Sequence, residues 1–152
     1  MRQGPLTFLF APFFILAFLL LQRVCADDIS LLEPRNHSTH YAGSDLTIHY
    51  KVNFNGMASL GSAAVSLADS RTGNIIQVFA EAIWLRSNGN RQVNFTWHIP
   101  RDFPSSTYIL RVVGPASYPC SRHNDGRPPY GRCTTIIENS VSFDIRSNNS
   151  YK

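Results

Sequence analysis

The feature that most constrains the fold is an alternation of apolar and polar residues that recurs along most of the chain. It is clearest in residues 46–54, Leu-Thr-Ile-His-Tyr-Lys-Val-Asn-Phe, where five apolar side chains alternate with polar ones. Successive side chains of a β-strand point to opposite faces, so this pattern predicts a strand with one buried face. No segment of the predicted domain sustains the period of about 3.6 residues that an amphipathic helix requires.

Similar runs predict further strands, and turn-forming residues such as Asn55-Gly56 separate them. These strands are expected at residues 29–32, 63–68, 75–79, 92–99, 107–113 and 141–146. About seven short strands at such spacing predict an all-β fold, an antiparallel β-sandwich of immunoglobulin or fibronectin type III style. Tyr108, near the start of the penultimate strand, fits either a tyrosine corner or a simple core position.

The N-terminal segment has the pattern of a cleaved secretory signal peptide. Arg2 precedes an apolar run over residues 6–21, and the segment ends in the small-residue motif Val24-Cys25-Ala26. The run is interrupted by Pro12, is shorter than the roughly 20 apolar residues of a membrane span, and is followed at once by two aspartates. The sequence therefore predicts a secreted protein, extracellular or in a cell wall, with no membrane span after cleavage. An uncleaved signal anchor is the alternative.

The expected domain organisation follows from this cleavage. Residues 1–26 form the signal peptide, residues 27–147 form one β-sandwich domain, and residues 148–152 form a disordered tail. Without Arg2 and Arg23, twelve basic residues remain against ten acidic ones, a formal charge of +2. A surplus this small, spread along the chain, does not indicate a nucleic-acid partner.

The cysteines indicate an oxidising compartment. Cys25 is expected to leave with the signal peptide, so Cys120 and Cys133 remain as an even pair and are predicted to form a disulfide. A link across a loop of this length stabilises a fold by about 3 kcal/mol in the chain-entropy model. Metal binding is the weaker interpretation, because only His123 lies between the two sulfurs and a tetrahedral ligand set is not complete.

Three sequons, beginning at Asn36, Asn94 and Asn148, predict N-glycosylation sites in a eukaryotic secreted protein. The second lies in the alternating stretch of residues 93–97, which directs Asn94 to the solvent face while its apolar neighbours point inward. A glycan on this asparagine would leave the core undisturbed. The same alternation predicts that Trp97 lies in the core, whereas Trp84 fits either an edge or an exposed platform.

The segment between the two cysteines is the candidate binding loop. Long loops held on a rigid scaffold often carry binding residues, and a disulfide lowers the cost of ordering them. The segment combines guanidinium groups with an imidazole and a phenol ring, in Arg122, His123, Arg127, Tyr130 and Arg132. These groups suit a carbohydrate or an anionic patch on a protein. The alternative is a hairpin whose disulfide serves only to resist proteolysis.

The sequence contains none of the common catalytic motifs. It has no G-x-S-x-G elbow, no P-loop, no dinucleotide fingerprint and no H-E-x-x-H zinc motif. Glycoside hydrolysis needs two facing carboxylates, but most acids lie at predicted strand ends, including Glu33, Asp69, Glu81, Asp102 and Glu138. His37 and His40 lack a third ligand and are expected to be two exposed polar residues. The sequence therefore predicts no enzyme, no catalytic or metal-binding residue and no cofactor.

Several segments together resemble the fungal cell-wall synthesis domain family. They are Ile-Ser-Leu-Leu-Glu-Pro at residues 29–34, Tyr-Ala-Gly-Ser at 41–44, Leu-Thr-Ile-His-Tyr at 46–50, Phe-Thr-Trp-His-Ile-Pro at 95–100 and Tyr-Ile-Leu-Arg-Val at 108–112. The family includes killer-toxin-resistance-type proteins implicated in cell-surface β-glucan assembly, and Ser/Thr-rich GPI-anchored fungal membrane proteins share its domain. The likeness spans about residues 29–146. This chain departs from the family in Tyr50, where a tryptophan is usual, and in lacking the Ser/Thr-rich stalk and GPI tail.

The resemblance implies a place of action and no catalytic residues. With the signal peptide and the sandwich, it predicts a secreted, non-enzymatic module at the fungal cell wall or surface, in β-glucan organisation or carbohydrate recognition. Its partner is then a cell-wall polysaccharide or an extracellular protein. The alternative is a protein-binding effector or adhesion component on the same scaffold, which predicts an exposed apolar patch near the disulfide. An unrecognised hydrolase is the third hypothesis.

Overall fold

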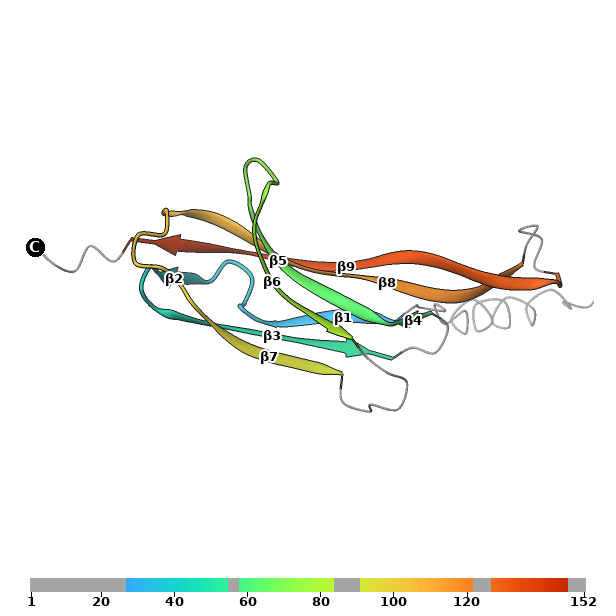
Figure 1. The fold of residues 1–152 in the computed structure, drawn as a ribbon. Helices are drawn as coiled ribbons and strands as arrows, with labels where there is room; N and C mark the ends of the chain where they lie inside the picture. Colours follow the sequence, from blue (N-terminus) through green and yellow to red (C-terminus); the bar gives the residue numbers. More distant parts are fainter. Residues whose placement is uncertain (1–26, 55–57, 84–90, 122–126, 148–152) are drawn as a thin grey trace, which may run out of the picture.

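The computed structural model describes residues 27–54, 58–83, 91–121 and 127–147, which form nine strands and no helix (Figure 1). The predicted signal peptide, the tail, Trp84 and Asn148 lie outside the described residues. Within the described part, no helix is long and apolar enough to cross a bilayer.

Two sheets form the predicted β-sandwich. The smaller sheet is antiparallel, in the order β1 (Asp28–Glu33), β3 (Asp45–Asn53) and β7 (Gln92–His98). The larger sheet runs in the order β2 (Thr39–Tyr41), β9 (Tyr130–Arg146), β8 (Ser106–Ser121), β5 (Ser62–Asp69) and β6 (Ile75–Ile83). A short β4 (Ser59–Leu60) also pairs with β8. All these pairs are antiparallel except β2 with β9, which is parallel.

All seven predicted strands are present, but two short strands were missed and three strands were predicted too short by four or more residues. β6 continues four residues beyond its predicted end at Phe79. β2 and β4 have three and two residues, too few to show an alternation. β8 continues eight residues beyond the predicted end at Val113, and β9 begins eleven residues before the predicted start at Val141. The extra lengths of β8 and β9 pair mainly with each other, and Gly114, Ala116 and Ser121 are their only buried residues, so they show little apolar alternation.

The core lies between the sheets and consists of the inward-facing residues of the alternating strands. Ile48, Tyr50, Leu110 and Phe143 are almost completely buried, and each such side chain contributes roughly 1.5–3 kcal/mol by leaving water. The predicted core position of Trp97 is confirmed. Its ring lies 5.1 Å from the ring centroid of Phe79 and 5.3 Å from that of Phe103, edge-on to both.

Tyr108 combines the two roles that the sequence left open. Its side chain is buried, and its hydroxyl donates a hydrogen bond to the Pro104 carbonyl, 2.7 Å away and four residues upstream. This is the geometry of a tyrosine corner at the start of the penultimate strand. The bond fixes the corner that leads from β7 into β8.

Gly114 marks the place where β8 exchanges one partner strand for another. β5 pairs with β8 as far as Val113, and β4 pairs with Ala116 and Ser117. The chain between β4 and β5 crosses at Gly114, where an added Cβ would collide with the Ser62 carbonyl. A glycine is therefore required at this close approach of two backbones.

Stability is expected to fall at alkaline pH through Tyr50. Burial raises the pKa of this phenol to about 12, so the folded state holds its proton more tightly than the unfolded state does. The tighter hold on this proton stabilises the folded state fully below about pH 10, and this contribution is lost as the pH rises through 12. Chemical denaturation of the wild type between about pH 9 and 12 should show this decline. The decline should be smaller in Tyr50→Phe and unchanged in the exposed control Tyr41→Phe.

Candidate functional site

The predicted binding segment lies at the far end of the β8–β9 hairpin. The two strands pair without interruption from Ser106 with Ile145 to Ser121 with Tyr130. Among the described residues, no third strand pairs with this hairpin beyond Ser117. The hairpin therefore continues beyond its last third-strand partner as a two-stranded ribbon, residues 118–121 and 130–133. We call this ribbon, together with residues 127–129 that lead into it, the arm. Figure 1 shows β8 and β9 running beyond the ends of the other strands.

A disulfide holds the arm together and confirms the predicted pairing of Cys120 with Cys133. Cys120 lies opposite Gly131 and Cys133 lies opposite Tyr118, so the link joins the strands diagonally, with Cα atoms 5.8 Å apart. A two-stranded ribbon is only marginally stable by itself in water. The disulfide compensates for the missing neighbours, and such links are typical of proteins in oxidising compartments.

The structure differs from the expected long loop over residues 120–133. β8 continues to Ser121 and β9 begins at Tyr130, so Tyr130 and Arg132 lie on a strand. Arg122 and His123 lie outside the described residues.

Three of the five candidate binding residues can be placed, and they lie close together at the surface of the arm. Tyr130 and Arg132 are two residues apart on β9 and share one face of the arm, with 61 % of Tyr130 exposed. Arg127 is exposed just before the strand begins. A phenol ring can stack on the apolar face of a sugar, and guanidinium groups donate planar hydrogen bonds to hydroxyl or carboxylate oxygens.

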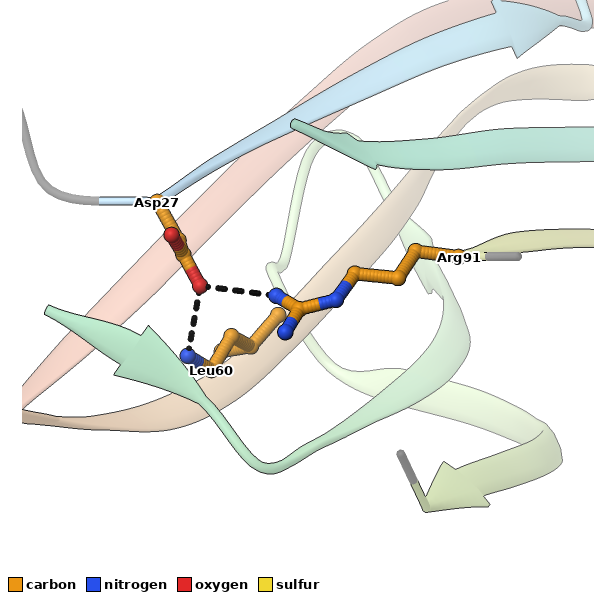
Figure 2. Close-up of polar contacts among 3 residues, drawn as sticks. All are labelled: Asp27, Leu60 and Arg91. Atoms are coloured by element: carbon orange, nitrogen blue, oxygen red, sulfur yellow. Dashed lines mark hydrogen bonds and ion pairs between the residues drawn. The ribbon is translucent and has the colours of Figure 1, made fainter. Parts of the chain in front are cut away.

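The base of the arm is braced by a buried ion pair (Figure 2). The Asp27 carboxylate accepts hydrogen bonds from the Leu60 backbone N–H at 2.9 Å and from the Arg91 guanidinium at 3.0 Å. The guanidinium carbon of Arg91 also lies 4.9 Å from the centre of the Phe54 ring. Since Leu60 pairs with Ala116 just before the arm, this cluster ties the first strand and the start of β7 to the arm's base.

Two of the three predicted glycosylation sites lie in the described part of the chain, and both are exposed. Asn94 points to the solvent face of β7, as its alternation indicated. The Asn36 side-chain oxygen accepts a hydrogen bond from the Ser142 backbone N–H at 3.0 Å. Both positions are accessible, and their modification stays a prediction.

His37 and His40 were both expected to be exposed, but only His37 is. His37 is exposed and has a φ of 60°, whereas His40 is half-buried and lies edge-on to Phe143 at 5.7 Å. Burial lowers the pKa of His40, against the smaller opposing effect of the Glu33 charge. Alternation did not reveal this burial because β2 has three residues and joins the sheet through β9, which is distant in sequence.

His40 lines an open pocket of about 380 Å³ at the end opposite the arm, and its Nε2 lies 2.9 Å from the Ser38 Oγ. Glu33, Arg35 and Asp45 also line it. Across the described ranges, no group of three His, Cys, Asp or Glu residues is placed to hold a metal ion.

Two of the acids considered for glycoside hydrolysis have structural partners. Asp69 accepts hydrogen bonds from the backbone N–H groups of Thr72 and Arg71, which lower its pKa. Glu138 accepts two hydrogen bonds from Arg111, at 2.8 and 2.9 Å. These contacts assign Asp69 to the β5–β6 turn and Glu138 to the ladder between β8 and β9.

No family model matches the sequence, and no curated protein matches it. Among solved structures, the chain is similar to a single-substitution variant of superoxide reductase (neelaredoxin) from Ignicoccus hospitalis. The TM-score is 0.52 at 8 % identity, over 80 % of this chain and 83 % of that one. The same superoxide reductase without a named substitution gives 0.50 at 8 % identity, over 78 % and 80 %. Fibronectin(III)-like modules of Clostridium thermocellum CbhA give 0.46 at 10 % identity, over 86 % and 52 %.

These similarities concern the fold, and they correct one prediction. The sequence predicted that the chain is not an enzyme, but the sandwich that it adopts is similar to that of an enzyme, a superoxide reductase. The prediction that the chain is not an enzyme rested on the absence of common catalytic motifs and on the family resemblance. It was wrong, because a missing motif does not exclude an enzyme on such a fold.

Proposed function

We propose that this protein is a secreted module of the fungal cell surface that binds a cell-wall polysaccharide, β-glucan first among them, through its arm. The resemblance to the fungal cell-wall synthesis domain family supports the setting. The apolar N-terminal segment and the disulfide support a route through the secretory pathway.

The observation that carries the proposal is the exposed face of the arm, with Tyr130 beside Arg132 and with Arg127 nearby. A polysaccharide offers apolar ring faces for stacking and hydroxyl groups for hydrogen bonds, and this face offers a partner for each. The disulfide orders the ribbon before a ligand arrives, so less conformational entropy is lost on binding.

The test is a pull-down of the protein secreted by cells that express the whole chain. Insoluble β-glucan, chitin and mannan are each incubated with the wild type and with the triple variant R127A/Y130A/R132A. The triple variant is expected to bind β-glucan at least about tenfold more weakly, because a few aromatic and arginine side chains usually dominate such interfaces.

A matched control keeps the composition of the change and moves it to the opposite end of the sandwich. Arg35, Tyr41 and Arg146 are exposed there, next to β2 and the end of β9. R35A/Y41A/R146A should bind β-glucan as the wild type does. If both triple variants lost β-glucan binding equally, the binding site would not lie on the arm. A wild type that binds none of the three polymers would refute the proposal.

An extracellular protein partner is the second candidate function. It is favoured by the apolar surface beside the disulfide, where Tyr130 and Ile136 are both more than half exposed. This interpretation predicts that the wild type binds a protein ligand and that R127A/Y130A/R132A does not. It also predicts that neither the wild type nor this variant binds any of the three polysaccharides.

A further inference from the structure

Four of the six large aliphatic side chains that are exposed in the described part of the chain lie on β6, the strand that ends the larger sheet. Ile75, Val78 and Ile83 are 60 %, 62 % and 72 % exposed, and Ile76 is 46 % exposed. We call these four residues the β6 patch. Soluble proteins normally expose large aliphatic side chains singly, and several of them gathered on one strand mark an interaction site.

The patch arises from two irregularities in the pairing of β6 with β5. Ser66 pairs with Val78 while the preceding Val65 pairs with Ala80, so Phe79 is an extra residue on β6. Its ring packs against Phe95 and Trp97, which leaves Val78 on the outside. A second irregularity makes Ile76 an extra residue beside Ile75. Bulges of this kind break the alternation of faces, and here they place several aliphatic side chains on the surface.

The outer face of the larger sheet continues this apolar surface. Because the odd-numbered residues of β5 between 63 and 67 belong to the core, the even-numbered ones lie on the outer face. Of these, Ser62 and Ala64 are partly exposed, whereas Ser66 and Ala68 are buried. Their cross-strand partners on β8 include Ile109, Arg111 and Val113. Beyond them on β9, Ile136 is 63 % exposed. The face thus extends from the β6 patch across small residues to Ile136.

Edge strands of soluble proteins are usually protected by lysine, proline or several charges. β6 has the sequence Ile-Ile-Gln-Val-Phe-Ala-Glu-Ala-Ile, with Glu81 as its only charged residue. The bulges bend the edge, but they do not hide the aliphatic side chains from water. The apolar composition of β6 is therefore typical of a strand in an interface and not of a protected edge strand.

We propose that the β6 patch and the adjoining outer face form the interface of a homodimer. The charges of the face support a second copy of this chain as the occupant. Arg111 and Glu138 stand on neighbouring strands and pair with each other within one copy. Across a twofold axis, the Arg111 of each copy can also meet the Glu138 of the other, so the face is complementary to itself.

The size of the face agrees with a dimer. Four strands spaced about 4.8 Å apart and about nine residues long, at about 3.4 Å per residue, cover roughly 20 by 30 Å. Each copy then buries about 600 Å² and the pair about 1,200 Å², the lower end of the range for stable specific interfaces. An interface of this size suits a dimer with a dissociation constant in the micromolar range. The proposal does not depend on the arm binding a polysaccharide.

Sedimentation equilibrium of the protein secreted from the full-length chain tests the proposal. The monomer mass comes from denaturing mass spectrometry of the same deglycosylated sample. The wild type is expected to sediment at twice that mass at about 100 μM, well above a micromolar dissociation constant. V78K/I83K should sediment as a monomer at the same concentration, because it places like charges in an apolar interface. The control L32K, at an exposed aliphatic residue of the smaller sheet, should remain a dimer.

A charge exchange keeps the proposal testable if the lysine variant fails to fold. R111E should weaken the dimer at least about tenfold, because two glutamates then face each other within and between copies. R111E combined with E138R restores opposite charges at both places and should restore the dimer. A monomeric wild type at about 100 μM would refute the dimer and would leave the β6 patch to an unlike partner. A V78K/I83K variant that is folded and still dimeric would place the interface elsewhere.

Discussion

Replacing Asp27 by alanine is expected to lower the free energy of unfolding by about 3–5 kcal/mol. The Asp27 side chain is completely buried, and Arg91, its ion-pair partner, has only 14 % of its side chain exposed. Alanine would leave that guanidinium without its carboxylate and would remove the acceptor of the Leu60 N–H. An unpaired buried charge costs far more than the intact pair contributes.

The neighbouring aspartate provides a matched control. Asp28 is exposed on β1, so Asp28→Ala should change the free energy of unfolding by no more than about 0.5 kcal/mol. Asp27→Asn keeps an acceptor for the Leu60 N–H and should be less harmful than alanine. Urea denaturation of the three variants measures these differences. Equal stability of Asp27→Ala and Asp28→Ala would show that the ion pair does not brace the first strand.

Replacing both cysteines of the arm by serine is expected to cost about 3 kcal/mol of stability in the chain-entropy model. Cys120 and Cys133 are separated by 13 residues, and their link restricts the unfolded chain as well as the arm. Because the arm has only two strands, its backbone amides should also exchange with solvent faster than those in the rest of β8 and β9.

Denaturant titration and hydrogen exchange of C120S/C133S measure the two effects separately. A reducing agent should shift the wild type to the stability of the serine variant and should leave the variant unchanged. A serine variant with wild-type stability and wild-type exchange in the arm would show that strand pairing alone holds the ribbon.

The strands that border the core could be predicted from the sequence because each has one buried and one exposed face. In β3, Leu46, Ile48, Tyr50 and Val52 are all buried, and the residues between them are more exposed. The same reasoning located Trp97 in the core and Asn94 on the surface. The disulfide followed from counting cysteines in a chain expected to be secreted.

The sequence predicted which residues belong to the candidate site, but not the backbone conformation that carries them. Tyr130 and Arg132 were expected in a loop, whereas they lie on a paired strand. Apart from Ser121, the described residues of the arm are partly or fully exposed and leave no clear periodic signal, so only the pairing of β8 with β9 shows that the segment is an arm. β2 and β4 were missed because they have three and two residues, too few to show an alternation, and because their partners lie far away in the sequence.

The sequence by itself determined the local features of this protein: its alternating strands, its turns, its cysteine pair and the side chains available to a ligand. The tertiary structure decided where two distant segments meet. It buried Asp27 against Arg91, it placed Gly114 under the chain between β4 and β5, and it turned Phe79 inward so that Val78 faces water. The physical reason is that periodicity records whether one face of a segment is buried. Contacts between segments depend on strand order and register, which no local pattern contains.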